Sequence, residues 1–271
     1  MGSIKYSCLL GLCWSSLLVA AQPADSLWLP VYEKASLRYF ALDPLQQLLA
    51  VGTDDEVVKY APDGQELFRY HNTVLGDLAT IDAADPFNIL LFFPEQQTVV
   101  LLDRTLSDRA QLDLRTTPVQ NATAAARSYD NNLWVYDDFA GRLFKLSSRG
   151  EVLFTSNDLR LSEGLRHGAT HILWQGNQLL LNFPERGVAV FSLQGRLLQW
   201  WPLPGITDCF LDQGQFFFRQ ADQYAVFLPE QQVREAFNWG STLPAPVCYR
   251  QQLDRRYLLD EQGLLRVQVR R

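Results

Sequence analysis

The sequence predicts an all-β protein, a six-bladed β-propeller whose blades are four-stranded and antiparallel. Short runs rich in Val, Leu, Phe and Tyr alternate with Asp, Asn, Gly and Gln, and no long segment keeps a helical period. The apolar runs that end in a turn recur six times, about every 40 residues, which is the period of a propeller blade. In this repeat the last unit lacks its fourth strand, and one additional strand precedes the first unit at the N-terminal end.

The third strand of each predicted blade marks the repeat most clearly. Successive markers are separated by 42, 44, 45, 36 and 40 residues. Each marker follows an apolar inner strand, a polar turn and a strongly apolar second strand, and an outer strand comes after it. The markers are Tyr60, Leu102, Leu146, Phe191, Phe227 and Val267.

The two ends of the chain complete one another in this scheme. The sixth unit stops at Arg271, directly after its third strand, while "SLWLPVYEK" at 26–34 precedes the first inner strand and alternates apolar and polar residues. An N-terminal strand that completes the last blade closes the ring and removes an exposed sheet edge. We therefore expect a single domain over 22–271. A pair of β-sandwiches, the main competitor, does not predict six units of one period.

The first 21 residues have the pattern of a secretory signal peptide. Lys5 is followed by an apolar run of 13 residues at 8–20, and small residues lie near Ala21. The run is shorter than the roughly 20 residues that span a bilayer. We expect cleavage near Ala21 and a periplasmic or secreted protein, with a retained anchor or a lipidated chain as the alternatives.

Charge argues against two classes of partner. Cleavage would remove one of the 24 basic residues and none of the 30 acidic ones, which takes the net charge from −6 to −7. Nucleic acid and anionic membrane surfaces are therefore poor partners for the mature chain.

Acidic residues recur in both kinds of turn within the predicted blades. Those in the turns between inner and second strands suit local turn chemistry, because Asp side chains bond their own backbone. Those between second and third strands, which we call the rim acids, would form a negative collar on one face and attract a basic partner. The first set is Asp43, Asp82, Asp130, Asp212 and Asp254. The rim acids are Asp55, Glu95, Asp138, Glu185, Asp222 and Glu261.

Histidines and cysteines offer few further candidates. His167 and His171 have a zinc-like spacing, but in a strand they would lie about 13 Å apart, too far for one metal ion. No metal site is therefore predicted, and His167 is a candidate contact in a loop. Cys209 and Cys248 fall in the inner strands of consecutive blades, so both a disulfide and two buried thiols remain open.

Catalytic motifs are not readable in the chain. It has no G-x-S-x-G, no phosphate loop, no clustered metal ligands and no Ser-His-Asp set with readable spacing. We therefore expect no enzyme and no cofactor.

The repeat pattern resembles NHL-like and TolB-like six-bladed propellers. More narrowly, "DPFNILLFFPEQQTVVLLDRTLS" at 85–107 and "DNNLWVYDDFAGRLFKLSSRGEVL" at 130–153 resemble a family of exported propeller proteins of Bacteroidetes. The resemblance implies the fold, the compartment and a binding role, and it carries over no catalytic residue. Some periplasmic proteins of these bacteria accompany the type IX secretion translocon, which a small propeller would suit.

Three functions follow from these observations. The first is a non-enzymatic scaffold, monomeric by itself, that binds a protein partner, for example at an outer-membrane complex such as that translocon. The second is a propeller enzyme, a hydrolase or lyase of glycans or lactones that uses rim carboxylates. The third is a binder of a small ligand or cation in the central channel.

Overall fold

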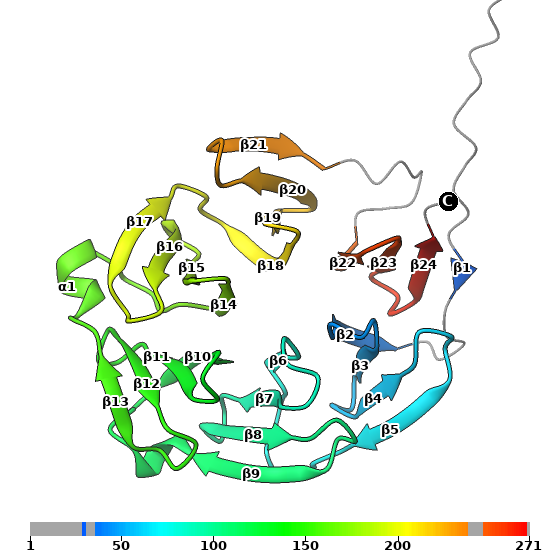
Figure 1. Ribbon diagram of the computed structural model, residues 1–271, viewed down its shortest axis with the longest axis horizontal. Helices are drawn as coiled ribbons and strands as arrows, with labels where there is room; N and C mark the ends of the chain where they lie inside the picture. Colours follow the sequence, from blue (N-terminus) through cyan, green and yellow to red (C-terminus); the bar gives the residue numbers. More distant parts are fainter. Residues whose placement is uncertain (1–28, 31–35, 238–245, 270–271) are drawn as a thin grey trace, which may run out of the picture.

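A computed structural model shows six four-stranded antiparallel sheets arranged as blades around a central axis (Figure 1). It describes residues 29–30, 36–237 and 246–269. The predicted signal peptide, 1–21, lies outside the described residues. The six-bladed β-propeller expected from the sequence is confirmed.

Each blade is numbered from its inner strand outward. Blade 1 contains β2 (Leu37–Leu42), β3 (Leu48–Gly52), β4 (Val57–Tyr60) and β5 (Glu66–Tyr70). Blade 2 contains β6 (Thr80–Asp82), β7 (Ile89–Phe93), β8 (Thr98–Leu102) and β9 (Asp108–Asp113). Blade 3 contains β10 (Ala122–Arg127), β11 (Leu133–Asp137), β12 (Arg142–Leu146) and β13 (Val152–Thr155).

The remaining blades follow the same order. Blade 4 contains β14 (His171–Gln175), β15 (Gln178–Phe183), β16 (Gly187–Ser192) and β17 (Leu197–Trp201). Blade 5 contains β18 (Ile206–Asp212), β19 (Gln215–Gln220), β20 (Gln223–Leu228) and β21 (Val233–Ala236). Blade 6 contains β22 (Cys248–Gln252), β23 (Arg255–Leu259), β24 (Leu265–Val269) and, from the N-terminal end, β1 (Leu29–Pro30).

The last blade is completed by the N-terminal strand, as predicted. β1 pairs antiparallel with β24, with Leu29 opposite Val267 and Pro30 opposite Arg266 (Figure 1). The pairing covers the outer edge of β24 and joins the two ends of the chain in one sheet.

The hydrophobic core lies between blades rather than at the axis. Second and third strands such as β7 and β8 are buried at every position, because both of their faces pack against neighbouring blades. Outer strands such as β21 are exposed at every position. Within the described residues, six apolar clusters form this core, one at each blade interface; Leu49 and Leu91, for example, belong to the cluster between blades 1 and 2.

In the part of the chain that the structure describes, two short helices lie in the connections between blades. They are η1 (Leu114–Thr116), between β9 and β10, and α1 (Leu159–Glu163), between β13 and β14. Asp158 caps α1 by accepting hydrogen bonds from the backbone of Arg160 and Leu161. No helix within the described residues has the length and apolarity needed to cross a membrane.

Strand direction gives the ring two distinct faces. In blade 1, Leu42 pairs with Leu48 next to the turn between inner and second strands, and Leu37 pairs with Gly52 at the other end. The turns between inner and second strands therefore share one face, which we call the cavity face. The turns between second and third strands, which carry the rim acids, lie on the opposite face.

Candidate functional site: the axial cavity

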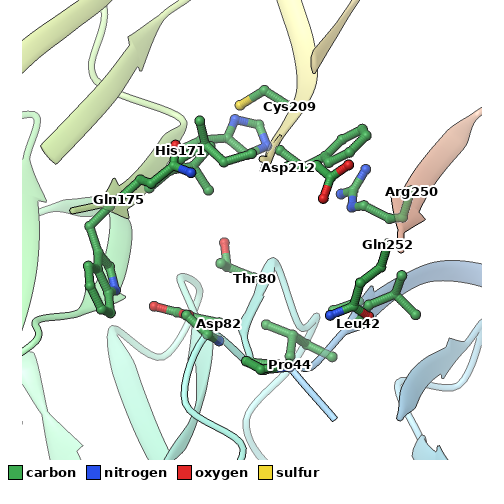
Figure 2. A pocket seen from close by; sticks show the side chains of 18 of the residues that line it. Leu42, Pro44, Thr80, Asp82, His171, Gln175, Cys209, Asp212, Arg250 and Gln252 are labelled. Atoms are coloured by element: carbon green, nitrogen blue, oxygen red, sulfur yellow. The ribbon is translucent and has the colours of Figure 1, made fainter. Parts of the chain in front are cut away.

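A cavity of 430 Å³ lies at the axis, on the cavity face (Figure 2). Its walls come from the inner strands of five blades, β2, β6, β14, β18 and β22, and from the turns that follow β2, β6 and β14. Carboxylate, imidazole and amide side chains surround its open centre among apolar residues (Figure 2). A mainly apolar pocket with a few converging polar groups is the usual form of a ligand site.

Asp82 supplies a carboxylate to the wall at the end of β6. Its Oδ1 accepts a hydrogen bond from Ala84 N (3.0 Å), and its Oδ2 accepts one from Arg127 N (2.8 Å). Burial raises the pKa of Asp82 above its ordinary value, although these two hydrogen bonds act in the other direction. Asp82 forms no ion pair among the described residues.

In two other blades, the acidic residue in the turn between inner and second strands has a lysine ammonium beside it. Asp43, in blade 1, has the buried Lys59 ammonium 3.4 Å from its Oδ2, and Asp130, in blade 3, has Lys145 at 2.6 Å. Asp82 differs from these two acids in forming no ion pair among the described residues, although the more distant positive charge of Arg127 acts to lower its pKa.

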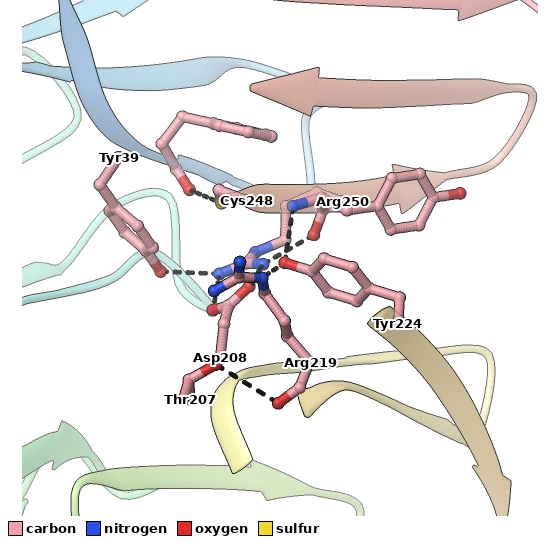
Figure 3. A network of polar contacts seen from close by, with 9 residues as sticks. Tyr39, Thr207, Asp208, Arg219, Tyr224, Cys248 and Arg250 are labelled. Carbon is pink, nitrogen blue, oxygen red and sulfur yellow. Dashed lines mark hydrogen bonds and ion pairs between the residues drawn. The ribbon is translucent and has the colours of Figure 1, made fainter. Parts of the chain in front are cut away.

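A buried ion pair lies beside the cavity and joins blades 5 and 6 (Figure 3). Arg250 Nη1 donates to Asp208 Oδ2 at 2.6 Å, and its Nη2 donates to Asp208 Oδ1 at 2.8 Å. The two parallel bonds form the fork geometry that makes an Arg–carboxylate pair strong. Arg250 lines the cavity, but its charge is already compensated.

Two tyrosines extend this pair into a network across three blades (Figure 3). Tyr39, in blade 1, accepts a hydrogen bond from Arg250 Nη2 (2.9 Å), and Tyr224 donates one to Asp208 (2.5 Å). We call these four residues the polar plug. Burial raises the pKa of Tyr39 to about 12. Burial also opposes ionisation of Asp208, but the Arg250 charge and its hydrogen bonds outweigh that effect, so the pKa of Asp208 is lowered.

The other cavity walls combine aromatic rings with a neutral imidazole. Tyr39, Trp174 and Phe210 all contribute to the lining. Burial lowers the pKa of His171, which therefore favours the uncharged form at neutral pH. Two buried polar atoms of the lining, Trp174 Nε1 and Gln252 Oε1, have no hydrogen-bond partner among the described residues. Such atoms usually require a water molecule or a ligand.

Two of the rim acids on the opposite face tie down the connections between blades. Asp55 accepts a hydrogen bond from Leu78 N (3.1 Å), at the entrance to blade 2. Glu185 accepts from the backbone nitrogens of Arg166 and His167, at the entrance to blade 4. These contacts give both carboxylates a role in holding the fold.

In blades 2 and 3 the corresponding hydrogen bond to the backbone is accepted by a residue close in sequence to the predicted acid. Gln97 Oε1, rather than Glu95, accepts the hydrogen bond from Ala122 N (2.6 Å). Asp137, rather than Asp138, binds the backbone at the entrance to its own blade. Glu95 is exposed, and Asp138 has one buried oxygen without a hydrogen-bond partner.

The remaining predicted contact residues are exposed on the same face. Asp222 pairs with Arg219 at 3.2 Å and keeps 88% of its side-chain surface exposed. Glu261 is exposed, and His167, 76% exposed, lies 3.3 Å from Glu185. The structure thus places the rim acids on one face, while the cavity opens on the other. A binding role for the rim acids and His167 stays a prediction.

Cys209 and Cys248 are both free and buried, so of the two alternatives that the sequence left open, the structure has two buried thiols and no disulfide between them. Cys209 is part of the cavity lining, and Cys248 contacts the carbonyl oxygen of Phe40 (3.8 Å). Burial raises the pKa of both thiols, that of Cys248 to about 12, so neither is an activated nucleophile.

Sequence reasoning assigned Asp82 to turn chemistry, which its bond to Ala84 confirms, but missed the cavity it faces. It also missed the polar plug. The available indication was a charged residue within each of two inner strands, Asp208 in "ITDCFLD" and Arg250 in "CYRQQ".

Within the described part of the chain, no three His, Cys, Asp or Glu side chains are grouped so that they could hold a metal ion.

Comparisons with known proteins support the fold. No protein-family model and no curated protein matches the chain. A streptogramin B lyase is similar with a TM-score of 0.58 and 10% identity, covering 87% of this chain and 83% of its own. The WD40 domain of Neurospora crassa Pan2 gives 0.57 and 12%, covering 87% and 76%. A chain of the mitotic checkpoint complex gives 0.58 and 8%, covering 89% and 76%.

At these identities the likeness shows a shared fold and nothing about activity. The fold and the site together define this protein as a six-bladed β-propeller with an axial cavity. The narrower resemblance to exported propellers of Bacteroidetes stays a prediction.

Proposed function

We propose that this protein is a non-enzymatic binding scaffold that receives a protein partner on its cavity face. The axial cavity is the observation that carries the proposal, because polar groups from separate blades converge there within an apolar lining. Its centre is well suited to receive a side chain from a partner whose surface rests on the surrounding turns.

Apolar residues in those turns support a protein partner. Four of the thirteen large hydrophobic side chains that are exposed in the described residues lie in turns of the cavity face. A protein interface typically combines such apolar contacts with a few buried polar anchors. The four residues, which we call the apolar turn tips, are Leu45, Phe87, Tyr129 and Leu253.

Compartment and partner complete the proposal. The N-terminal sequence supports export to the periplasm or the cell exterior, and the repeat pattern supports kinship with exported propellers of Bacteroidetes. An outer-membrane complex, such as the type IX secretion translocon, is the setting that these two features suggest.

A small molecule held in the cavity is the second candidate, favoured by the cavity's volume of 430 Å³. The propeller enzyme is favoured less, because two of the rim carboxylates on which it would depend are committed to backbone amides.

Crosslinking in periplasmic extract of the native host, followed by recovery of the tagged protein, tests the scaffold. Leu45→Asp combined with Leu253→Asp alters the cavity face, and Val74→Asp combined with Phe139→Asp alters exposed residues of the opposite face as a matched control. We expect the crosslinked partner to disappear only with the first pair. Recovery of monomer alone from the wild type, or equal loss with both pairs, contradicts the proposal.

A further inference from the structure

We propose that the axial cavity binds an organic cation, an ammonium or guanidinium group on an apolar stem, with Asp82 as its anionic partner. The inference rests on the proposed function for the location of the site and adds the chemistry of the group that enters it.

Charge in the cavity favours a cation over an anion. Arg250 is the one positively charged side chain in the described lining, and Asp208 already compensates it through two short hydrogen bonds. His171 is held uncharged by burial. Asp82 and Asp212 add carboxylates, and Asp82 forms no ion pair among the described residues, although Arg127, which is not part of the lining, acts on it from a greater distance. The described lining is therefore net negative, and a bound cation would remove the cost of leaving Asp82 charged in a half-buried site.

The walls are suited to the rest of such a ligand. Trp174 presents aromatic surface, which attracts cations through the ring face and packs against methylene groups. The rings of Tyr39 and Phe210 already lie beside the Arg250 guanidinium, with centroids at 5.4 and 5.1 Å, and add apolar surface to the wall. A cavity of 430 Å³ is large enough for a lysine or arginine side chain and lies within the range of small-molecule sites, about 300–1,000 Å³.

An organic cation also fits better than a metal ion. Calcium takes about six to eight oxygen ligands at close range. The described residues bring together no group of three candidate ligands. A carboxylate in a cavity that also has aromatic walls is instead the kind of environment in which proteins hold alkylammonium groups.

The same chemistry can come from a free amine or from a lysine or arginine of a partner protein. Calorimetric titration with two probes distinguishes these sources: n-butylammonium, and Nα-acetyl-lysine N-methylamide. Tighter binding of the lysine amide indicates a partner's side chain, and equal or tighter binding of n-butylammonium indicates a free amine. Nα-acetyl-norleucine N-methylamide has nearly the same stem without the charge and serves as the ligand control.

Asp82→Asn and Asp254→Asn form the matched pair of protein variants. Both remove one carboxylate from the cavity face, but Asp254 is exposed in its turn and does not line the cavity. We expect Asp82→Asn to weaken binding of the lysine amide by at least about tenfold, and Asp254→Asn to leave it within about twofold. Equal binding of the norleucine amide, or unchanged binding by Asp82→Asn, overturns the inference, as does the absence of measurable binding by either cation.

A second variant supplies the cation from within the chain. Thr80 lies two residues before Asp82 on the same face of β6, and both contribute to the cavity wall (Figure 2). Thr80→Lys should place an ammonium beside Asp82, raise the melting temperature above that of Thr80→Met, and abolish binding of the lysine amide. Equal melting temperatures together with retained binding would contradict the assignment.

The partner-recovery experiment separates failure of this inference from failure of the scaffold proposal. If Asp82→Asn still recovers the partner while the Leu45 and Leu253 double variant does not, the scaffold proposal is supported and a cationic side chain of the partner at Asp82 is contradicted. If the cavity-face double variant recovers the partner as well as the wild type does, the scaffold proposal falls, and the calorimetry decides the cation site by itself.

Discussion

The polar plug and the part of the cavity wall that carries Asp82 lie around the same axis, but their carboxylates differ in whether they have a positively charged partner. In the plug, Asp208 faces a guanidinium through two hydrogen bonds, and Tyr224 donates a third. At the cavity wall, Asp82 accepts two backbone hydrogen bonds, is half-buried, and forms no ion pair among the described residues. Consequently the pKa of Asp208 is lowered, while that of Asp82 is raised.

This difference separates a structural site from the proposed binding site. A carboxylate whose pKa falls on folding stabilises the folded state at neutral pH, whereas one whose pKa rises destabilises it. A residue kept at a cost to stability, inside a cavity, is a candidate for function. The plug thus holds blades 1, 5 and 6 together, and Asp82 is the proposed contact of a ligand.

The largest effect is expected from breaking the plug. Asp208→Asn leaves the Arg250 charge buried without its carboxylate, and loss of one partner from a buried pair costs about 3–5 kcal/mol. Urea unfolding measures the change. The double variant Asp208→Leu, Arg250→Met serves as the control, because joint replacement by apolar residues should recover much of the loss. A loss below about 1 kcal/mol for Asp208→Asn would show that the plug is not structural.

Lowering the pH should reduce the contribution of Asp208 to the stability of the folded state and increase that of Asp82. Because the folded pKa of Asp208 lies below its ordinary value of 3.8, its contribution is present above that value and is lost as the pH falls through the folded pKa. Asp82 has the opposite sign: its contribution to stability declines as the pH rises from 3.8 through its raised folded pKa. We expect the melting temperature of Asp82→Asn, relative to that of the wild type, to increase as the pH rises from 3.8 through the folded pKa of Asp82. A relative melting temperature that decreases over this range would contradict the assigned direction.

A smaller effect on stability is expected from Asp82→Asn at neutral pH. The substitution removes a poorly solvated charge but also loses one of two backbone hydrogen bonds, so the net change should stay within about 1 kcal/mol. Urea unfolding of the purified variant tests this. A loss as large as that of Asp208→Asn would place Asp82 in the structural class.

The smallest effect is expected on the opposite face. Glu185→Gln keeps an acceptor but removes the charge that strengthens the bonds from Arg166 and His167, at a cost of about 0.5–1 kcal/mol. Faster hydrogen exchange should be confined to these two amides. Uniform acceleration throughout blade 4 would show a broader role.

Periodicity predicted the ring and its closure, because a blade needs four strands at nearly constant spacing and each spacing can be counted along the chain. It could not predict the plug, because Tyr39, Asp208 and Arg250 meet only when blades 1, 5 and 6 close. The rim acids were recognisable as a set, but which of them bind backbone depends on side-chain geometry. Glu95 and Gln97 are two positions apart, and it is the uncharged Gln97 that accepts the hydrogen bond from the backbone of Ala122.

The location of the site can be tested directly by titrating ¹⁵N-labelled protein with Nα-acetyl-lysine N-methylamide and following the backbone amide shifts. We expect the perturbed amides to cluster at 82–84, 171–176 and 209–212, around the axial cavity. Perturbation centred on the turns that carry Asp55, Glu95 and Glu185 would place binding on the opposite face and contradict the assignment of the axial cavity.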